Sequence, residues 1–178
     1  MERLPPAGAI TAFDRSWYGR VLVERVEELV PTRRWKAAYR EITEFERMMT
    51  DDGTRLVKLF FHITPDEQLR RFEARLHYPM KRWKLSFEDF RNRRHWHDYF
   101  QATEEMLART STANAPWCVI PAEDKRYGRI AAMTEIARRL GRGVDLGPPS
   151  LDDAILAEAQ QHLRLEPSQI ARLSGRTE

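Results

Sequence analysis

Three short apolar runs alternate with longer amphipathic segments, and this alternation limits the possible fold more than any other feature of the sequence. The runs cover 10–13, 55–63 and 117–120. Each is too short for a helix of ordinary length and has turn residues beside it, which favours a β-strand. Strands that alternate with helices form βαβ units, so the sequence predicts an α/β fold with a parallel sheet and flanking helices.

The spacing of apolar residues and the capping signals predict helices between and after these runs. At 64–67 the sequence TPDE supplies a cap residue, a proline at the first helical position and a glutamate that can close a capping box. Ser86 and Asp89 repeat the capping pattern at the start of a long helix. The expected helices cover about 17–28, 33–49, 65–77, 87–110, 125–140 and 151–163.

Charged residues follow the first apolar run directly. The stretch AITAFDRSWYGR at 9–20 changes from apolar to charged at Asp14 and Arg15. Ligands of open α/β sheets bind where strands end, near helix N-termini, so we expect Asp14, Asp124 and the segment after 63 to meet at one sheet edge. An aspartate there can hold magnesium, and an arginine can bind phosphate oxygens in a planar fork. Asp14 is equally compatible with a cap for a helix that begins near Trp17.

Basic residues are concentrated in one part of the chain. The formal net charge of the whole sequence is +3, whereas residues 70–94 carry nine Lys/Arg and three Asp/Glu, a local net charge of +6. A concentration of positive charge of this kind indicates a polyanionic partner, with an ordinary solvated surface as the alternative.

Several classes of function lack their sequence signals. Cys118 is the only cysteine, so no intramolecular disulfide can form. The sequence has no HExxH, no paired cysteines and no GxSxG, and His95 and His97 are too close in sequence to share a helix face. No signal peptide opens the chain and no run approaches the length of a membrane span, which predicts a cytoplasmic protein with no membrane partner.

Three strings of the sequence resemble one known family. FDRSWYGRVLVERVE at 13–27 resembles the second nucleotide-binding motif of the polyphosphate kinase type two family. EQLRRFEARLHYPMKRWKLSFEDF at 67–90 is similar to the lid of that family, and TSTANAPWCVIPAEDKRYGR at 110–129 is similar to its closing strand and loop. The resemblance covers roughly residues 3–140, and the three strings occur in the family's order.

The resemblance implies a P-loop kinase-like fold with a helical lid over about 65–110. It also implies a partial polyphosphate kinase domain over 1–142, followed by a linker, a short helix and a tail over 143–178. The activity implied is magnesium-dependent, in-line transfer of phosphate between polyphosphate and AMP or ADP, with the AMP-using branch favoured. The implied partners are therefore polyphosphate, AMP, ADP and ATP, and no nucleic acid.

The resemblance also assigns roles to individual residues. Asp14 would bind Mg²⁺, and Arg15 would contact the phosphate chain beside it. Lid arginines would close over the transferring phosphoryl group, lid lysines would face polyphosphate, and a loop after the third strand would lie near the nucleotide. The residues implied are Arg71 and Arg75 as catalytic arginines, and Arg20, Lys81, Lys84, Asp124, Lys125 and Arg126 as binding residues. Each of these side chains could equally be surface charge, and Asp124 could instead cap the next helix.

One element of the family is missing from these 178 residues. A P-loop kinase uses GxxxxGK[ST], whose backbone N–H groups and lysine surround the phosphates, and no such string occurs here. Family members carry this loop upstream of the matching region. We therefore expect a fold that is incomplete at its N-terminus.

The missing loop leaves three functional interpretations. The first is a phosphotransferase with polyphosphate as donor and AMP or ADP as acceptor. A homo-oligomer, or a partner chain that supplies the loop, is a separate expectation for the assembly. The second is an inactive truncated remnant that binds polyphosphate or nucleotide or complements a partner chain. The third is a nucleic-acid-binding module with Trp83 and Trp96 as stacking groups.

Overall fold

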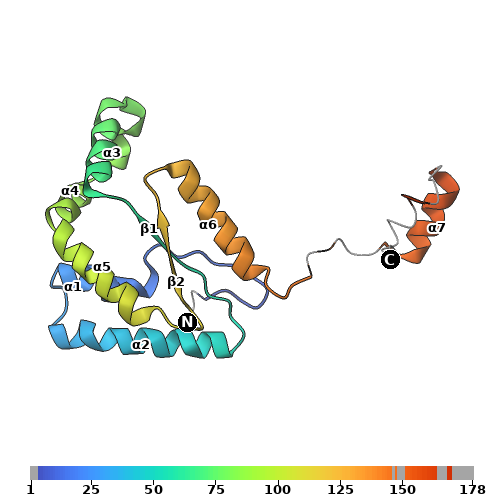
Figure 1. Cartoon of the computed structure of the whole chain (residues 1–178), viewed down its shortest axis with the longest axis horizontal. Coiled ribbons are helices and arrows are strands. Elements are labelled where there is room, and N and C mark those ends of the chain that lie inside the picture. Colours follow the sequence, from blue (N-terminus) through green and yellow to red (C-terminus); the bar gives the residue numbers. More distant parts are fainter. Residues whose placement is uncertain (1–3, 146, 148–150, 164–167, 170–178) are drawn as a thin grey trace. The chain divides into compact units, whose positions relative to one another are not determined.

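The second and third apolar runs form a parallel sheet. The computed structural model describes residues 4–145, 147, 151–163 and 168–169. In it, β1 (Lys58–His62) pairs in parallel with β2 (Trp117–Pro121), with Lys58 opposite Trp117 and His62 opposite Pro121 (Figure 1). The connection between the two strands contains helices, as a parallel pair requires. The predicted α/β class with a parallel sheet and flanking helices is confirmed.

The first apolar run does not form the predicted strand. Residues 9–13 have no regular secondary structure, and Ile10 is 80% exposed. A strand is defined by hydrogen bonds to a neighbouring strand, and no described segment pairs with this one. An apolar run alone does not tell whether a neighbouring strand is present to pair with it.

The helix predicted over 17–28 is two short elements. They are the 3₁₀-helix η1 (Ser16–Arg20) and α1 (Val23–Val26). The Tyr18 carbonyl accepts bonds from the N–H groups of both Val21 and Leu22, at 3.1 and 3.2 Å, which tightens this turn. Leu22 then leaves the helical conformation, with φ −110° and ψ −83°.

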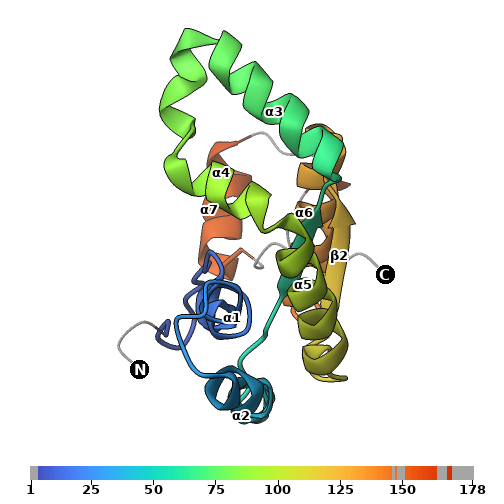
Figure 2. The same cartoon turned by 90° about the vertical axis from the view of Figure 1, so that its left-hand side faces the viewer.

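Two long helices pack against η1 to form the core. They are α2 (Thr32–Asp51) and α5 (Trp96–Thr110), which lie side by side in both views (Figures 1 and 2). Apolar residues from each line the interface, because helical spacing puts them on one face. The buried cluster consists of Tyr18, Val21, Ala38, Tyr39, Ile42 and Met106.

The segment between β1 and α5 forms a helical hairpin, which we call the lid hairpin. It contains α3 (Pro65–His77), the 3₁₀-helix η2 (Pro79–Lys84) and α4 (Phe87–Arg94), with η2 connecting the two helices (Figure 2). The helix predicted over 87–110 is thus two helices, α4 and α5, separated at His95. Arg93 donates to the Pro65 carbonyl and to Gln68, which holds α4 against the start of α3.

The two predicted capping boxes have different outcomes. Thr64 Oγ1 accepts from the Glu67 N–H at 3.3 Å, but the Glu67 carboxylate binds arginines on α3 instead of closing the box. The Ser86 N–H donates to the Asp89 carboxylate at 2.8 Å, so the second box is confirmed. Competition from the nearby arginines accounts for the difference.

Two further helices follow β2 in the described part of the chain. Helix α6 (Lys125–Leu140) packs on β2, and a second unit of the chain, Gly141–Glu178, contains α7 (Asp153–His162). Asp152 caps α7 by accepting from the Ala154 N–H at 2.8 Å. Most of the predicted tail lies outside the described residues. Within the described ranges, no helix has the length and apolar character needed to cross a bilayer.

Candidate functional site

Basic side chains from the lid hairpin and from the segment after β2 lie close enough for their charges to interact. Arg71 and Arg75 belong to α3, Lys81 to η2, and Lys125 is the first residue of α6. Desolvation, followed by the positive charges of the other three residues, lowers the pKa of the Lys125 amine below its ordinary value. We call these four residues the cation cluster. Repulsion among these four positive charges favours the binding of an anion near them.

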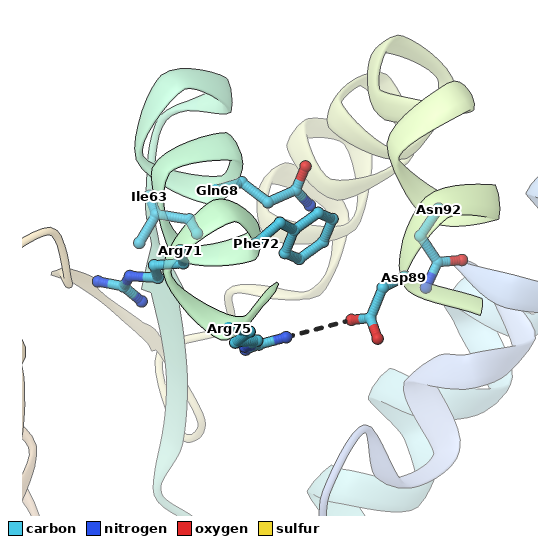
Figure 3. Close-up of a pocket in the computed structure, with 7 residues that line it drawn as sticks. All are labelled: Ile63, Gln68, Arg71, Phe72, Arg75, Asp89 and Asn92. Carbon is cyan, nitrogen blue, oxygen red and sulfur yellow. Dashed lines mark ion pairs between the residues drawn. The ribbon is translucent and has the colours of Figure 1, made fainter. Parts of the chain in front are cut away.

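Arg71 connects the lid hairpin to the segment after β2. Its guanidinium donates to the carbonyl groups of Ala122 at 2.5 Å and Glu123 at 3.1 Å, and to the Glu67 carboxylate at 2.7 Å. Figure 3 shows the side chain pointing away from α4. Hydrogen bonds from Arg70 and Arg71 lower the pKa of Glu67 to about 2, so this carboxylate stays ionised at neutral pH.

Arg75 lies across the lid hairpin from α4. Its Nη1 is 3.5 Å from Asp89 Oδ1, as the dashed line in Figure 3 marks, and its guanidinium stacks on Phe72 at 5.5 Å. The space between α3 and α4 is a pocket of about 210 Å³. Its lining residues are Ile63, Gln68, Arg71, Phe72, Arg75, Asp89 and Asn92.

Lys81 and Lys84 present unpaired charge near the end of the hairpin. The Lys81 amine lies 4.4 Å from the centre of the Tyr78 ring and the Lys84 amine 5.1 Å from that of Trp83. Both lysines are exposed, and neither forms an ion pair with any carboxylate that the structure describes. Their charges are therefore available to an anion from solvent.

Asp14 is exposed, and its carboxylate makes no hydrogen bond or ion pair within the described chain. The cap residue of η1 is Arg15 and no side chain caps that helix, so the interpretation of Asp14 as a cap is wrong. Mg²⁺ commonly binds one or two carboxylates and completes its shell with water and substrate phosphates. A free, exposed carboxylate fits that requirement, although the described residues contain no group of three or more candidate metal ligands.

The structure does not join Asp14 and its neighbours to the cation cluster. Arg15 is exposed, and its positive charge partly offsets the rise in the pKa of Tyr99 of α5 that burial causes. Arg20 forms an ion pair with Glu41 at 2.6 Å. No hydrogen bond or ion pair links Asp14, Arg15 or Arg20 to the cluster in the described ranges. The expected meeting at one sheet edge required a strand at 10–13, which is absent.

The loop after β2 contains the remaining candidates. Asp124 Oδ1 accepts from the N–H groups of Arg126 at 2.7 Å and Tyr127 at 3.1 Å, so Asp124 caps α6. This cap orients the first turn of α6, which carries Lys125 into the cation cluster. The Arg126 side chain is exposed.

The acidic and carbonyl partners of the arginines were not among the residues predicted from the sequence. Glu67 lies four residues before Arg71, and this helical spacing could have identified the pair. Asp89 was interpreted only as a capping residue, although it also faces Arg75. The Ala122 and Glu123 carbonyl groups give no signal in a sequence, because every residue has one.

Comparison with known proteins identifies the family. The model of a family described as polyphosphate kinase 2 (PPK2) matches residues 1–142. The chain belongs to the polyphosphate kinase 2 family. A crystal structure of polyphosphate kinase 2 from Arthrobacter aurescens is similar to this chain, with a TM-score of 0.77 and 37% identity over 92% of this chain and 58% of that one.

Curated relatives match the same region at higher identity. A polyphosphate:AMP phosphotransferase from Pseudomonas syringae is 47% identical over 78% of this chain and 28% of its own length. An AMP/ADP-polyphosphate phosphotransferase from Meiothermus ruber is also 47% identical, over 71% of this chain and 47% of its own length. The chain thus spans less than half of the length of these relatives.

The contacts of Arg71 lead to a prediction about the attachment of the lid hairpin. Arg71→Gln removes the charge-assisted bonds to the Ala122 and Glu123 carbonyl groups, so it should lower the free energy of unfolding by about 1–2 kcal/mol. Amide hydrogen exchange in 64–75 and 122–124 should become faster. Arg70→Gln is the matched control, since Arg70 also binds Glu67 but does not reach the segment after β2, and its effect should stay within about 0.5 kcal/mol. Equal effects of the two variants would contradict this role of Arg71.

Proposed function

We propose that this chain takes part in transfer of a phosphoryl group between polyphosphate and AMP or ADP. The observation that carries the proposal is the cation cluster, in which basic residues of α3, η2 and α6 act electrostatically on one another and Arg71 joins α3 to the segment before α6. Lys81 and Lys125 form no ion pair within the described chain, so a polyanion can neutralise them. Family membership and the names of the relatives support polyphosphate and an adenine nucleotide as the substrates.

The proposed roles follow from what phosphoryl transfer requires. The reaction depends on holding donor and acceptor in line and on offsetting charge at the phosphate oxygens. Arg75 provides a planar guanidinium for those oxygens, and Arg71 provides its Nη1, since its Nε and Nη2 bind Glu67 and two carbonyl groups. Lys81, Lys84 and Lys125 provide point charges along a phosphate chain. Arg15 and Arg20 are proposed as further phosphate contacts, and Arg126 as a contact near the nucleotide.

A magnesium ion is proposed as the cofactor, with Asp14 as its protein ligand. When bound, Mg²⁺ would offset negative charge on the phosphate oxygens. The support is the free, exposed carboxylate of Asp14. The unpaired Cys118 agrees with a reducing compartment, and we place the reaction in the cytoplasm.

A second candidate function is binding without transfer. It is favoured by the absence of GxxxxGK[ST] from these 178 residues. Such a protein would hold polyphosphate or nucleotide without transferring a phosphoryl group. The nucleic-acid interpretation has less support, because Trp96 is half-buried and only Trp83 of the proposed stacking pair is exposed.

An activity assay separates the two candidates. The 178-residue chain is incubated with polyphosphate, Mg²⁺ and AMP or ADP, alone and with a separately produced segment that carries the glycine-rich loop. Phosphorylated nucleotide in either reaction supports the first candidate. Polyphosphate binding without product in both reactions supports the second, and absence of binding contradicts both.

The role of Asp14 is tested in whichever reaction is active. Asp14→Asn keeps the shape of the side chain but removes the charge that would hold Mg²⁺. Turnover should fall by at least about two orders of magnitude, on the scale of other transition-state electrostatic contacts. Asp52→Asn, a change at another exposed aspartate, should leave turnover unchanged. Near-normal turnover of Asp14→Asn would contradict the assignment.

The lid lysines are tested by binding. Lys81→Ala combined with Lys84→Ala should weaken polyphosphate binding by at least about tenfold, since two unpaired charges are lost. Binding should also weaken with rising salt concentration, because exposed charges are screened. The matched control is Arg33→Ala with Lys36→Ala, which removes the same charge from the exposed surface of α2. Equal affinities of the two double variants would contradict the proposed contact.

A further inference from the structure

The backbone before η1 adopts a costly conformation. Arg15 has φ 63° and Ser16 has φ 54°, so two successive residues other than glycine lie in the left-handed region. Side chains make this region unfavourable, and such a turn persists only where its surroundings hold it. The turn directly follows Asp14 and sets the direction of its side chain relative to η1.

Aromatic residues hold the turn on both sides. Phe13 precedes it and Trp17 follows it, and their ring centres lie 5.8 Å apart. Trp17 also packs edge-on against Phe45 of α2 at 5.2 Å. Trp17 thus links the turn to α2, Phe13 packs on Trp17, and Asp14 is exposed.

A single carboxylate binds the two residues that follow the turn. Trp17 Nε1 donates to Glu46 Oε1 at 3.1 Å, and the Tyr18 hydroxyl donates a short hydrogen bond to the same oxygen. Glu46 belongs to α2 and is completely buried. Burial, together with the neighbouring Glu46 charge, raises the pKa of Tyr18, so its hydroxyl remains protonated and available as a donor.

Lys58 of β1 completes the cluster. Its Nζ donates to Glu46 Oε2 at 2.8 Å, to the Tyr18 hydroxyl at 2.9 Å and to the carbonyl of Thr110 at 2.6 Å. Only 6% of Lys58 is exposed. The three donors of an ammonium group are thus all used inside the protein. The cluster connects η1, α2, β1 and the end of α5.

A buried ion pair of this kind contributes little net stability compared with apolar residues of similar volume. Its contribution lies in fixing the groups that it binds, because every donor and acceptor must keep its partner. Here those groups include Trp17 and Tyr18, which immediately follow the left-handed turn.

We propose that Glu46, Lys58 and Tyr18 are positioning residues for Asp14 and Arg15. They hold η1 in place, η1 stabilises the left-handed turn, and the turn orients the Asp14 carboxylate. The catalytic meaning of this proposal rests on the proposed function, in which Asp14 binds Mg²⁺. The conformational claim can be tested without any activity.

Hydrogen exchange measured by mass spectrometry, together with the thermal midpoint, tests the proposal on the 178-residue chain. Tyr18→Phe keeps the ring and removes one hydroxyl, and Glu46→Gln keeps the shape and removes the charge. Both should accelerate exchange of amides 14–18 by about tenfold or more, while exchange in α6 changes little. Glu105→Gln is the matched control, because it breaks an ion pair of 2.6 Å with Arg25 but makes no contact with 13–18. It should leave exchange of 14–18 unchanged.

The double variant Glu46→Met with Lys58→Met distinguishes positioning from general stability. It should restore the thermal midpoint toward that of the unaltered chain, while amides 14–18 continue to exchange rapidly. If the double variant restores both the thermal midpoint and the slow exchange of amides 14–18, the proposal is overturned. If the double variant does not fold, Tyr18→Phe decides: unchanged exchange of 14–18 in that variant overturns the proposal.

Activity adds a second, separable result. In whichever reaction forms product, Tyr18→Phe should lower kcat with little change in KM for AMP. The Asp14 carboxylate would be displaced, whereas the basic side chains proposed to bind phosphate would stay in place. Rapid exchange of amides 14–18 without a change in kcat would support the positioning of Asp14 by the cluster. It would contradict the role of Asp14 in phosphoryl transfer.

Discussion

The buried ion pair between Glu46 and Lys58 is the contact on which the first unit of the chain, Met1–Leu140, depends. It joins helix α2 to strand β1, and through Tyr18 and the Thr110 carbonyl it also holds η1 and the end of α5. Loss of one partner would leave a buried charge without compensation, at a cost of about 3–5 kcal/mol. The sheet therefore cannot shift relative to α2 without breaking this pair.

The lid hairpin is held much more weakly than this core. Phe72 is the only buried residue in α3, and η2 and α4 have none. Its attachment to the segment after β2 relies on a few polar contacts, chiefly those of Arg71 with two carbonyl groups. Few buried contacts imply low local stability, which agrees with the proposed role of the hairpin in closing over substrate. The cation cluster thus includes residues of this weakly held hairpin and of the first turn of α6.

The sequence predicted those features that depend on local patterns. Strands β1 and β2 and the start of α3 follow from apolar runs and capping residues. The roles proposed for the lid arginines and lysines rest on the charge density and the family resemblance. The prediction of a strand at 10–13 was wrong. A strand needs a hydrogen-bonded neighbour, and the local sequence pattern does not show whether there is one. Glu46 and Lys58 gave no signal, since a glutamate in a helix and a lysine beside an apolar run are both common on surfaces. Only the packing of α2 against β1 brings them together.

The most direct test of the proposed site uses the lysines as reporters, because the chain has only Lys36, Lys58, Lys81, Lys84 and Lys125. Their rates of acetylation are measured by mass spectrometry with and without polyphosphate. We predict that polyphosphate protects Lys81, Lys84 and Lys125, that exposed Lys36 stays reactive, and that buried Lys58 reacts slowly in both cases. Protection of Lys36 to the same extent, or an unprotected Lys125, would contradict a phosphate-binding site between the lid hairpin and the start of α6.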